Sequence, residues 1–246
     1  MLRKRFGLLG RNISYSFSKG YFTEKFNTEN LTECSYENFD IQDINDFPEI
    51  IKANSDLKGL NVTIPYKETV MPFLDELSER ASKIGAINVI KITKEGKLKG
   101  YNSDYYGFKK ALEPLLLAHH KKALILGTGG ASKAVAYALE ELGIQHTFVS
   151  RNPAENAINY SQITAAVFSE NHIIINSTPL GTSPKTDEFP DIPYHFFTNK
   201  HIAFDLIYNP AETQFLKKAK EAGAIVKNGM EMLVFQAEKA WEIWNE

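Results

Sequence analysis

Cysteine is nearly absent from the chain, since Cys34 is the one cysteine among 246 residues. A lone cysteine excludes an internal disulfide and any zinc site built from several thiolates. Chains without disulfides are typical of reducing compartments. The composition therefore predicts a cytoplasmic protein.

Long apolar runs are also missing, and none approaches the length that a bilayer-spanning helix needs. The N-terminal stretch MLRKRFGLLGRN is basic and then briefly apolar, but Gly10 and Arg11 interrupt it too early for a signal peptide. We therefore expect no association with a membrane.

Neither sign of charge dominates, because the chain has 28 Lys and Arg and 30 Asp and Glu, which give a formal net charge of −2. With a pI of about 6.3 there is no overall electrostatic attraction to nucleic acid. The six histidines are scattered along the sequence, and we expect His119 and His120 to be solvated at a helix end. No nucleic-acid partner and no metal site are predicted.

Strand and helix patterns alternate along the chain, which is typical of α/β proteins with largely parallel strands. The first half indicates strands at 5–9, 34–41 and 57–65, a hairpin that starts with a strand at 87–93, and helices at 19–27 and 46–53. The second half opens with a helical pattern from Asp104 and then a β-loop-α-β unit with strands at 122–126 and 147–150 around a helix at 131–142. We predict two α/β domains, residues 1–103 and residues 104–228, with a C-terminal helix at about 229–246 that returns to the first.

The segment LILGTGGAS places Gly127, Gly129 and Gly130 between a buried strand and a helix. Such glycines allow a tight turn and let a pyrophosphate approach the backbone at the helix N-terminus. Ser132 stands at the third glycine of the usual motif, so an ordinary strand-to-helix turn is the alternative. The next strand ends in Ser150 and Arg151 without an acidic residue, which favours NADP over NAD, unless Arg151 is only a solvated surface charge.

The N-terminal half offers polar groups at three predicted strand ends, in the segments SYSFS, NVTIPYK and NVI with YNSD. Open α/β sheets bind ligands at the carboxyl ends of their strands. The candidates are Ser16, Ser18, Asn61, Thr63, Lys67, Asn88, Asn102 and Asp104. Singly, such residues cap helices, form turns or are solvated. Together they suit a small polyol that carries an acid group.

Nine segments in order, SYSFS, NVTIPYK, GAINV, YNSD, GTGGAS, SRN, NSTPLG, DLIYNP and NGMEMLVFQA, resemble the shikimate dehydrogenase family. The resemblance runs from about residue 7 to the C-terminus. It implies a substrate-binding domain made of the N-terminal half and the last helix, together with an NADP-binding Rossmann domain. It also implies reversible hydride transfer between the nicotinamide and C3, which interconverts 3-dehydroshikimate and shikimate.

The resemblance assigns roles to individual residues. Lys67 and Asp104 match the catalytic pair, which is expected to meet in the cleft. The substrate-binding positions match Ser16, Ser18, Thr63, Asn88, Asn102, Tyr208 and Gln236. The cofactor-binding positions match Gly127, Gly129, Gly130, Ala131, Arg151, Thr178, Gly229 and Met232.

Lys67 is the predicted proton donor. A ketone gains negative charge on its oxygen as the hydride arrives, and a proton donor at that oxygen lowers the barrier to hydride transfer. Asp104 is expected to orient Lys67 and to share the proton. Which of the two carries the proton in the transition state stays open. Pro65 ends the strand before Lys67, and we expect this break to direct the lysine into the cleft.

Several positions depart from the family pattern. Tyr15 and Lys19 replace a histidine and a proline beside the two serines, and Val89 replaces a threonine. Glu155, preceded by Pro153, stands where a second arginine is common, and its carboxylate would oppose a 2′-phosphate. The use of both NADP and NAD therefore stays open.

Three other functions remain as alternatives. One is a paralogue that oxidises quinate with NAD, to which Tyr15 and Val89 give some room, and another is a ligand sensor without turnover, which the Lys67 and Asp104 pair disfavours. The third is a methylene-tetrahydrofolate dehydrogenase, which the serine loop and NVTIPYK fit poorly. The sequence does not decide between a monomer and a homodimer.

Overall fold

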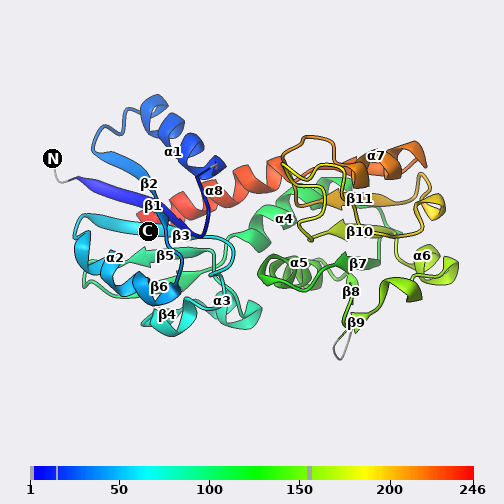
Figure 1. The fold of residues 1–246 in the computed structure, drawn as a ribbon, viewed down its shortest axis with the longest axis horizontal. Helices are drawn as coiled ribbons and strands as arrows, with labels where there is room; N and C mark the ends of the chain where they lie inside the picture. Colours follow the sequence, from blue (N-terminus) through cyan, green and yellow to red (C-terminus); the bar gives the residue numbers. More distant parts are fainter. Residues whose placement is uncertain (1–2, 15, 154–156) are drawn as a thin grey trace. The chain divides into compact units, whose positions relative to one another are not determined.

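The structure is a computed structural model that describes residues 3–14, 16–153 and 157–246 (Figure 1). The chain divides into two compact units. Unit 1 comprises Met1–Ser103 and Ala237–Glu246, and unit 2 comprises Asp104–Gln236. A membrane span would need a longer and more apolar helix than any in the described part of the chain.

The sheet of unit 1 has the strand order β2-β1-β3-β5-β6-β4. Its strands are β1 (Lys4–Gly10), β2 (Cys34–Asp40), β3 (Leu57–Val62), β4 (Glu76–Leu77), β5 (Val89–Ile92) and β6 (Leu98–Tyr101). Strand β1 pairs in parallel with β2 and β3, whereas β5 is antiparallel to both β3 and β6. The predicted hairpin is therefore confirmed, and it turns at Gly96, whose φ is 81°.

Helices cover both faces of this sheet. They are α1 (Phe17–Thr28), α2 (Phe47–Ala53) and α3 (Glu79–Ile84), with short 3-10 turns at Ile44–Asp46 and Met71–Phe73. Phe6 and Leu8 of β1 pack with Phe22 of α1 on one face, and Leu9 packs with Phe47 of α2 on the other. This alternation follows from the two-residue period of a strand.

The C-terminal helix α8 (Met230–Asn245) supplies Ala237, Ala240, Ile243 and Trp244 to the core of unit 1. The Trp244 ring stacks on Phe6 at 4.9 Å between centroids, and its Nε1 donates a hydrogen bond to the Ile90 carbonyl at 3.0 Å. Tyr21 of α1 also donates to Glu238 of α8. The predicted return of the last helix to the first domain is confirmed by these contacts.

The sheet of unit 2 is parallel throughout, with the order β12-β11-β10-β7-β8-β9. Its strands are β7 (Lys122–Leu126), β8 (Gln145–Val149), β9 (Ala157–Ile158), β10 (Ile173–Asn176), β11 (Ile202–Asp205) and β12 (Ile225–Lys227). Counted along the chain from β7, this is the 3-2-1-4-5-6 order of the Rossmann fold. The predicted α/β class is confirmed.

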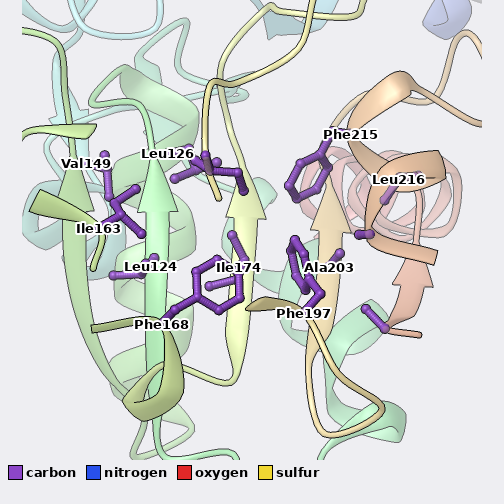
Figure 2. Packing of buried hydrophobic residues seen from close by; sticks show 13 residues of the cluster. Leu124, Leu126, Val149, Ile163, Phe168, Ile174, Phe197, Ala203, Phe215 and Leu216 are labelled. Carbon is purple, nitrogen blue, oxygen red and sulfur yellow. The ribbon is translucent and has the colours of Figure 1, made fainter. Parts of the chain in front are cut away.

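Helices also cover both faces of this second sheet. They are α4 (Asp104–Leu112), α5 (Gly130–Glu141), α6 (Ala165–Glu170) and α7 (Gln214–Glu221), with 3-10 turns at Glu113–Leu115, Tyr160–Gln162 and Tyr194–Phe196. Figure 2 shows the aromatic rings of the cluster lying against strand residues such as Leu124, Ile174 and Ala203. On the opposite face, Phe108 of α4 meets Phe204 edge-on at 4.9 Å.

Four histidines gather at the amino ends of three neighbouring strands. His119 and His120 precede β7, His172 precedes β10 and His201 precedes β11. The ring centroid of His119 lies 4.2 Å from that of His120 and 5.1 Å from that of His172, which lies 5.3 Å from that of His201. His120 and His201 are buried, and the Lys200 carbonyl lies 3.1 Å from Nε2 of His119 and of His120. The expectation of a solvated His120 is wrong, whereas His119 is exposed as expected. Although the histidines are scattered along the sequence, parallel pairing brings these four to one edge of the sheet. In the described residues, no group of three or more His, Cys, Asp or Glu side chains is arranged to hold a metal ion.

Gly59 of β3 lies directly under Trp244, and a Cβ at this position would overlap the indole ring. We expect Gly59→Ala to destabilise unit 1 by roughly 1–3 kcal/mol, the usual cost of overpacking a dense core. Tryptophan fluorescence during urea unfolding measures this directly, because both tryptophans, Trp241 and Trp244, belong to unit 1. Gly20→Ala is the control, since no described atom lies within 4 Å of the added Cβ in α1. It should stabilise the helix by about 0.5–1 kcal/mol. Equal effects of the two substitutions would contradict the packing argument.

Burial, together with the charge of neighbouring histidines, lowers the pKa of His120, His172 and His201 below the ordinary value of 6.5. The unfolded chain then binds more protons than the folded one, so we expect the free energy of unfolding to fall as the pH drops below about 6.5. Asp205 acts in the opposite direction, because burial raises its pKa from 3.8 to about 6.

Urea unfolding at pH 7.5 and 5.5, followed by circular dichroism, separates the two contributions. His172→Gln should lose less stability on acidification than the wild type, whereas exposed His195→Gln should match the wild type. Asp205 is common to all three proteins, so it cancels in the comparison. An unchanged pH dependence in His172→Gln would contradict the role assigned to the cluster.

Candidate active site

Most of the candidate residues of unit 1 lie at one edge of its sheet. Thr63 follows the carboxyl end of β3, Asn102 follows that of β6, and Ser16 and Ser18 lie on the segment after β1. Asn88 precedes β5, and because β5 is antiparallel to β3 its amino end reaches the same edge. The sheet topology thus brings five residues from four segments to one edge.

Backbone hydrogen bonds hold these strand ends in register. The Thr63 N–H donates to the Leu9 carbonyl at 2.9 Å, and the Val62 N–H donates to the Asn88 carbonyl at 2.8 Å. The Asn88 N–H donates in turn to the Tyr101 carbonyl at 3.0 Å. Bonds of this kind fix where each side chain starts.

The polar side chains of this edge are buried and hydrogen-bonded. Asn88 is 2% exposed, and its amide donates to Ser103 Oγ at 3.0 Å while its Oδ1 accepts from the Ser103 N–H at 2.6 Å. Asn102 is 4% exposed and donates to the Ala86 carbonyl at 2.9 Å. Buried amides keep one orientation when their partners are fixed, which favours ligand binding without rearrangement.

Tyr36 is hydrogen-bonded to the end of β3. Its hydroxyl donates to Asn61 Oδ1 at 2.8 Å. Burial raises the pKa of Tyr36 well above its ordinary value, so this hydroxyl stays protonated and keeps donating. Ser16 caps α1, because its Oγ accepts from the Ser18 N–H at 3.2 Å.

Lys67 lies on the turn segment that follows β3, which ends at Val62 before Pro65. Its carbonyl accepts from the Ile87 N–H at 2.8 Å, and the side chain is half-buried. Asp104, 1% exposed, is the first residue of α4 in unit 2 and comes two residues after Asn102.

The glycine loop follows β7 at the carboxyl edge of the unit 2 sheet. Gly127 has φ of 106°, and its N–H donates to the Val149 carbonyl at 2.9 Å. Gly129 precedes α5, which begins with Gly130 and Ala131. Ser132, in place of a third glycine, is 1% exposed and donates to the Gly129 carbonyl at 2.6 Å.

Other candidates of unit 2 follow the neighbouring strands. Thr178 comes after β10, and the exposed Arg151 comes after β8, where its carbonyl accepts from Asn159 at 3.0 Å. Tyr208 follows β11, and Gly229 follows β12 and donates to the Ile207 carbonyl at 3.0 Å. On α8, Met232 is buried and Gln236 is half-buried beside Gly107 of α4. The candidates after β7, β8, β10, β11 and β12 thus share the carboxyl edge of this sheet.

Three buried residues beside this edge were not predicted from the sequence. Asn176 and Asp205 are fully buried, and Thr213 is 1% exposed. Burial raises the pKa of Asp205 to about 6, although bonds from Thr213, Ile207 and Asn176 oppose that shift. The aspartate of the segment DLIYNP could have indicated this network from the sequence. An acidic residue at the end of a buried strand needs hydrogen-bond partners.

The structure describes two of the four residues that depart from the family pattern. Val89 is fully buried in the core that contains Phe6, and Lys19 is exposed on α1. Tyr15 and Glu155 lie outside the described residues.

Comparison with known proteins identifies the family. The family model described as the shikimate dehydrogenase substrate binding domain matches residues 8–90. The shikimate dehydrogenase (NADP(+)) of Clostridium beijerinckii is 40% identical over 251 residues, which cover 98% of this chain and 92% of that protein. The chain belongs to the shikimate dehydrogenase family.

Solved structures of other members have the same fold. Shikimate 5-dehydrogenase from Thermus thermophilus, in complex with NADP(H) and shikimate, aligns with a TM-score of 0.87 at 32% identity and covers 98% of this chain and 93% of its own. Quinate dehydrogenase from Corynebacterium glutamicum, in complex with NAD, aligns with a TM-score of 0.86 at 26% identity over the same shares.

The glycine loop has room for a side chain at Gly129 but not at Gly127. A Cβ at Gly127 would lie 3.1 Å from Ser177 Oγ and 3.2 Å from Thr178 Cγ2, at a φ that side chains rarely adopt, whereas one at Gly129 would meet no described atom within 4 Å. We expect Gly127→Ala to destabilise unit 2 by roughly 1–3 kcal/mol. Gly129→Ala, at φ of −80°, should cost less than about 1 kcal/mol as a poorer helix cap.

Thermal unfolding followed by circular dichroism tests this pair, because residues 104–236 contain no tryptophan. A loss at Gly129 equal to that at Gly127 would show that the chain needs glycine at both positions. The expected difference would instead leave room for an external group as the reason for glycine at 129.

Proposed function

We propose that the chain catalyses the reversible, NADPH-dependent reduction of 3-dehydroshikimate to shikimate. The observation that carries this proposal is the similarity over 98% of the chain to a shikimate dehydrogenase (NADP(+)). The two sheet edges supply the groups that such a reaction needs. One offers neutral hydrogen-bonding side chains with Lys67, and the other offers a glycine loop at a helix N-terminus.

The carboxyl edge of the unit 2 sheet fits a dinucleotide. The first N–H groups of α5 have no partner within the helix, and Gly129 leaves open space where a side chain would stand. Gly127, Gly129, Gly130 and Ala131 would hold the pyrophosphate, and Arg151 would hold the 2′-phosphate of NADP. Thr178, Gly229 and Met232 would lie near the nicotinamide.

The residues of unit 1 would bind the substrate with groups already held in place. Ser16 and Ser18 would bind the carboxylate at the N-terminus of α1, where the helix dipole favours an anion. Thr63, Asn88 and Asn102 would bind the hydroxyl groups of the ring. Tyr208 and Gln236, which belong to unit 2, are proposed as further substrate-binding residues. Because Asn88 and Asn102 are buried and hydrogen-bonded, their orientation costs little when the substrate arrives.

Bound NADPH supplies the hydride that is added to C3 of the ketone. Lys67 would donate a proton to the carbonyl oxygen as negative charge develops there, which yields shikimate and NADP⁺. In the reverse direction the neutral amine of Lys67 would accept the hydroxyl proton. Asp104 is proposed to act with Lys67 in this proton transfer.

A reducing compartment is part of the proposal, because the one cysteine, Cys34, is free. We infer the cytoplasm as the site of action. The proposed partners are the substrate and the dinucleotide.

Absorbance at the NAD(P)H band during titration with shikimate tests the activity, with NADP and NAD in parallel. We expect the wild type to reduce NADP, and Lys67→Ala to lose roughly 10²–10⁴-fold in kcat, the usual contribution of a general acid or base. Lys58→Ala is the matched control, since Lys58 is an exposed lysine on β3 and should leave turnover unchanged.

Other outcomes would favour the other functions. Reduction of NAD with quinate, and little turnover of shikimate, would indicate the quinate paralogue. Binding of shikimate or quinate in a calorimeter without reduction of either cofactor would indicate a sensor. Full activity in Lys67→Ala would remove the lysine from the reaction while leaving the activity itself established.

A further inference from the structure

Asp205, at the carboxyl end of β11, is a fully buried carboxylate with three hydrogen-bond donors around it. Its Oδ1 accepts from Asn176 Nδ2 at 3.1 Å and from the Ile207 N–H at 3.0 Å, and its Oδ2 accepts from Thr213 Oγ1 at 2.6 Å. Bonds to an ionised acceptor are stronger than neutral ones. The carboxylate therefore fixes its three neighbours firmly, and among them the Asn176 side chain.

Asn176, at the end of β10, transmits this constraint to Thr178. Its Oδ1 accepts from the Thr178 N–H at 3.1 Å and from Thr178 Oγ1 at 2.6 Å, while its Nδ2 reaches Asp205 and the Leu180 carbonyl. Because Asp205 accepts hydrogen bonds in its ionised form, it determines that the amide turns its nitrogen toward β11 and its oxygen toward Thr178.

Thr178 is consequently held at both its backbone and its side chain. Its hydroxyl donates to Asn176 and accepts from the Leu180 N–H at 3.3 Å, so the direction of the O–H bond is set. Thr178 also lies beside the glycine loop, since a Cβ at Gly127 would come within 3.2 Å of its Cγ2. The two segments form the point between β7 and β10 where the strand order reverses, which is where Rossmann folds bind dinucleotides.

We propose that the buried pair Asp205 and Asn176 are positioning residues that hold Thr178 in the geometry needed by the bound dinucleotide. The inference rests on the proposed function. Neither residue touches the ligand in this arrangement, and both act through Thr178. A buried polar network that is fully bonded rigidifies its surroundings, which lowers the ordering cost of binding.

Binding of NADP, measured by titration calorimetry in the absence of substrate, tests the proposal without turnover. Asn176→Ala removes the acceptor of both Thr178 bonds, and we expect the Kd for NADP to rise about tenfold, which corresponds to about 1.4 kcal/mol. In kinetics, KM for NADP should rise by a similar factor with a smaller change in KM for shikimate.

Two further variants separate positioning from stability. Thr213→Ala removes another partner of the same carboxylate and the cap of α7, so it should lower the thermal midpoint and leave the Kd for NADP unchanged. Asp205→Asn keeps an oxygen toward Asn176 and turns its amide toward the Thr213 hydroxyl, which can accept, so it should bind NADP nearly as the wild type does.

Thr178→Val keeps the test decisive if Asn176→Ala fails to fold, because it removes only the half-buried hydroxyl. It should weaken NADP binding by a factor similar to that expected for Asn176→Ala. The proposal is overturned if Thr178→Val or folded Asn176→Ala binds NADP as the wild type does. It is also overturned if Thr213→Ala weakens binding as much, since the pair would then act only on stability. A wild type that binds no NADP would instead refute the proposed function.

Discussion

Parallel strand pairing is the constraint on which the functional geometry of this chain depends. In a parallel sheet all carboxyl ends lie at one edge, so residues far apart in sequence become neighbours once the strands align. In unit 2 this joins the segments after β7, β10 and β11. In unit 1 it joins the ends of β1 and β3, and the antiparallel β5 adds Asn88 at its amino end. Each unit therefore brings its candidate ligand-binding groups to one edge.

The two edges of the unit 2 sheet carry different kinds of buried polar group. At the amino edge the Lys200 carbonyl lies 3.1 Å from Nε2 of His120, and burial lowers the pKa of His120, His172 and His201. At the carboxyl edge Asp205 is surrounded by donors, although its burial opposes ionisation. A buried charge is costly unless it is fully bonded, so the presence of an aspartate at this carboxyl edge needs a reason. Orientation of Asn176 and Thr178 provides one.

The fold class and the order of elements could be predicted from the sequence because they depend on local patterns. The buried run Lys122–Leu126, the glycines after it and the helix formers that follow are adjacent in the chain. The contact between His172 and His201 and the Asn176–Asp205 bond could not be predicted in this way, since each joins residues 29 positions apart that meet only through strand register. The bond between Asn88 and Ser103 depends in the same way on the hairpin. Helix α7 was also not predicted, because the first apolar residues of the helix follow a loop rich in turn formers. Thr213 is nevertheless a good helix cap.

The serine in place of the third glycine shows how a motif can change while its physical requirement is kept. That glycine allows close packing of the helix on the strand, and a serine there must bury a hydroxyl as well as a Cβ. Ser132 Oγ donates to the carbonyl of Gly129, the residue that caps α5, so the hydroxyl is satisfied locally. The residue is small enough to be buried on the packed face of α5, at 1% exposed. The departure from the motif therefore keeps a small residue with a satisfied hydroxyl at this packed position. A serine there is compatible with a dinucleotide at this loop.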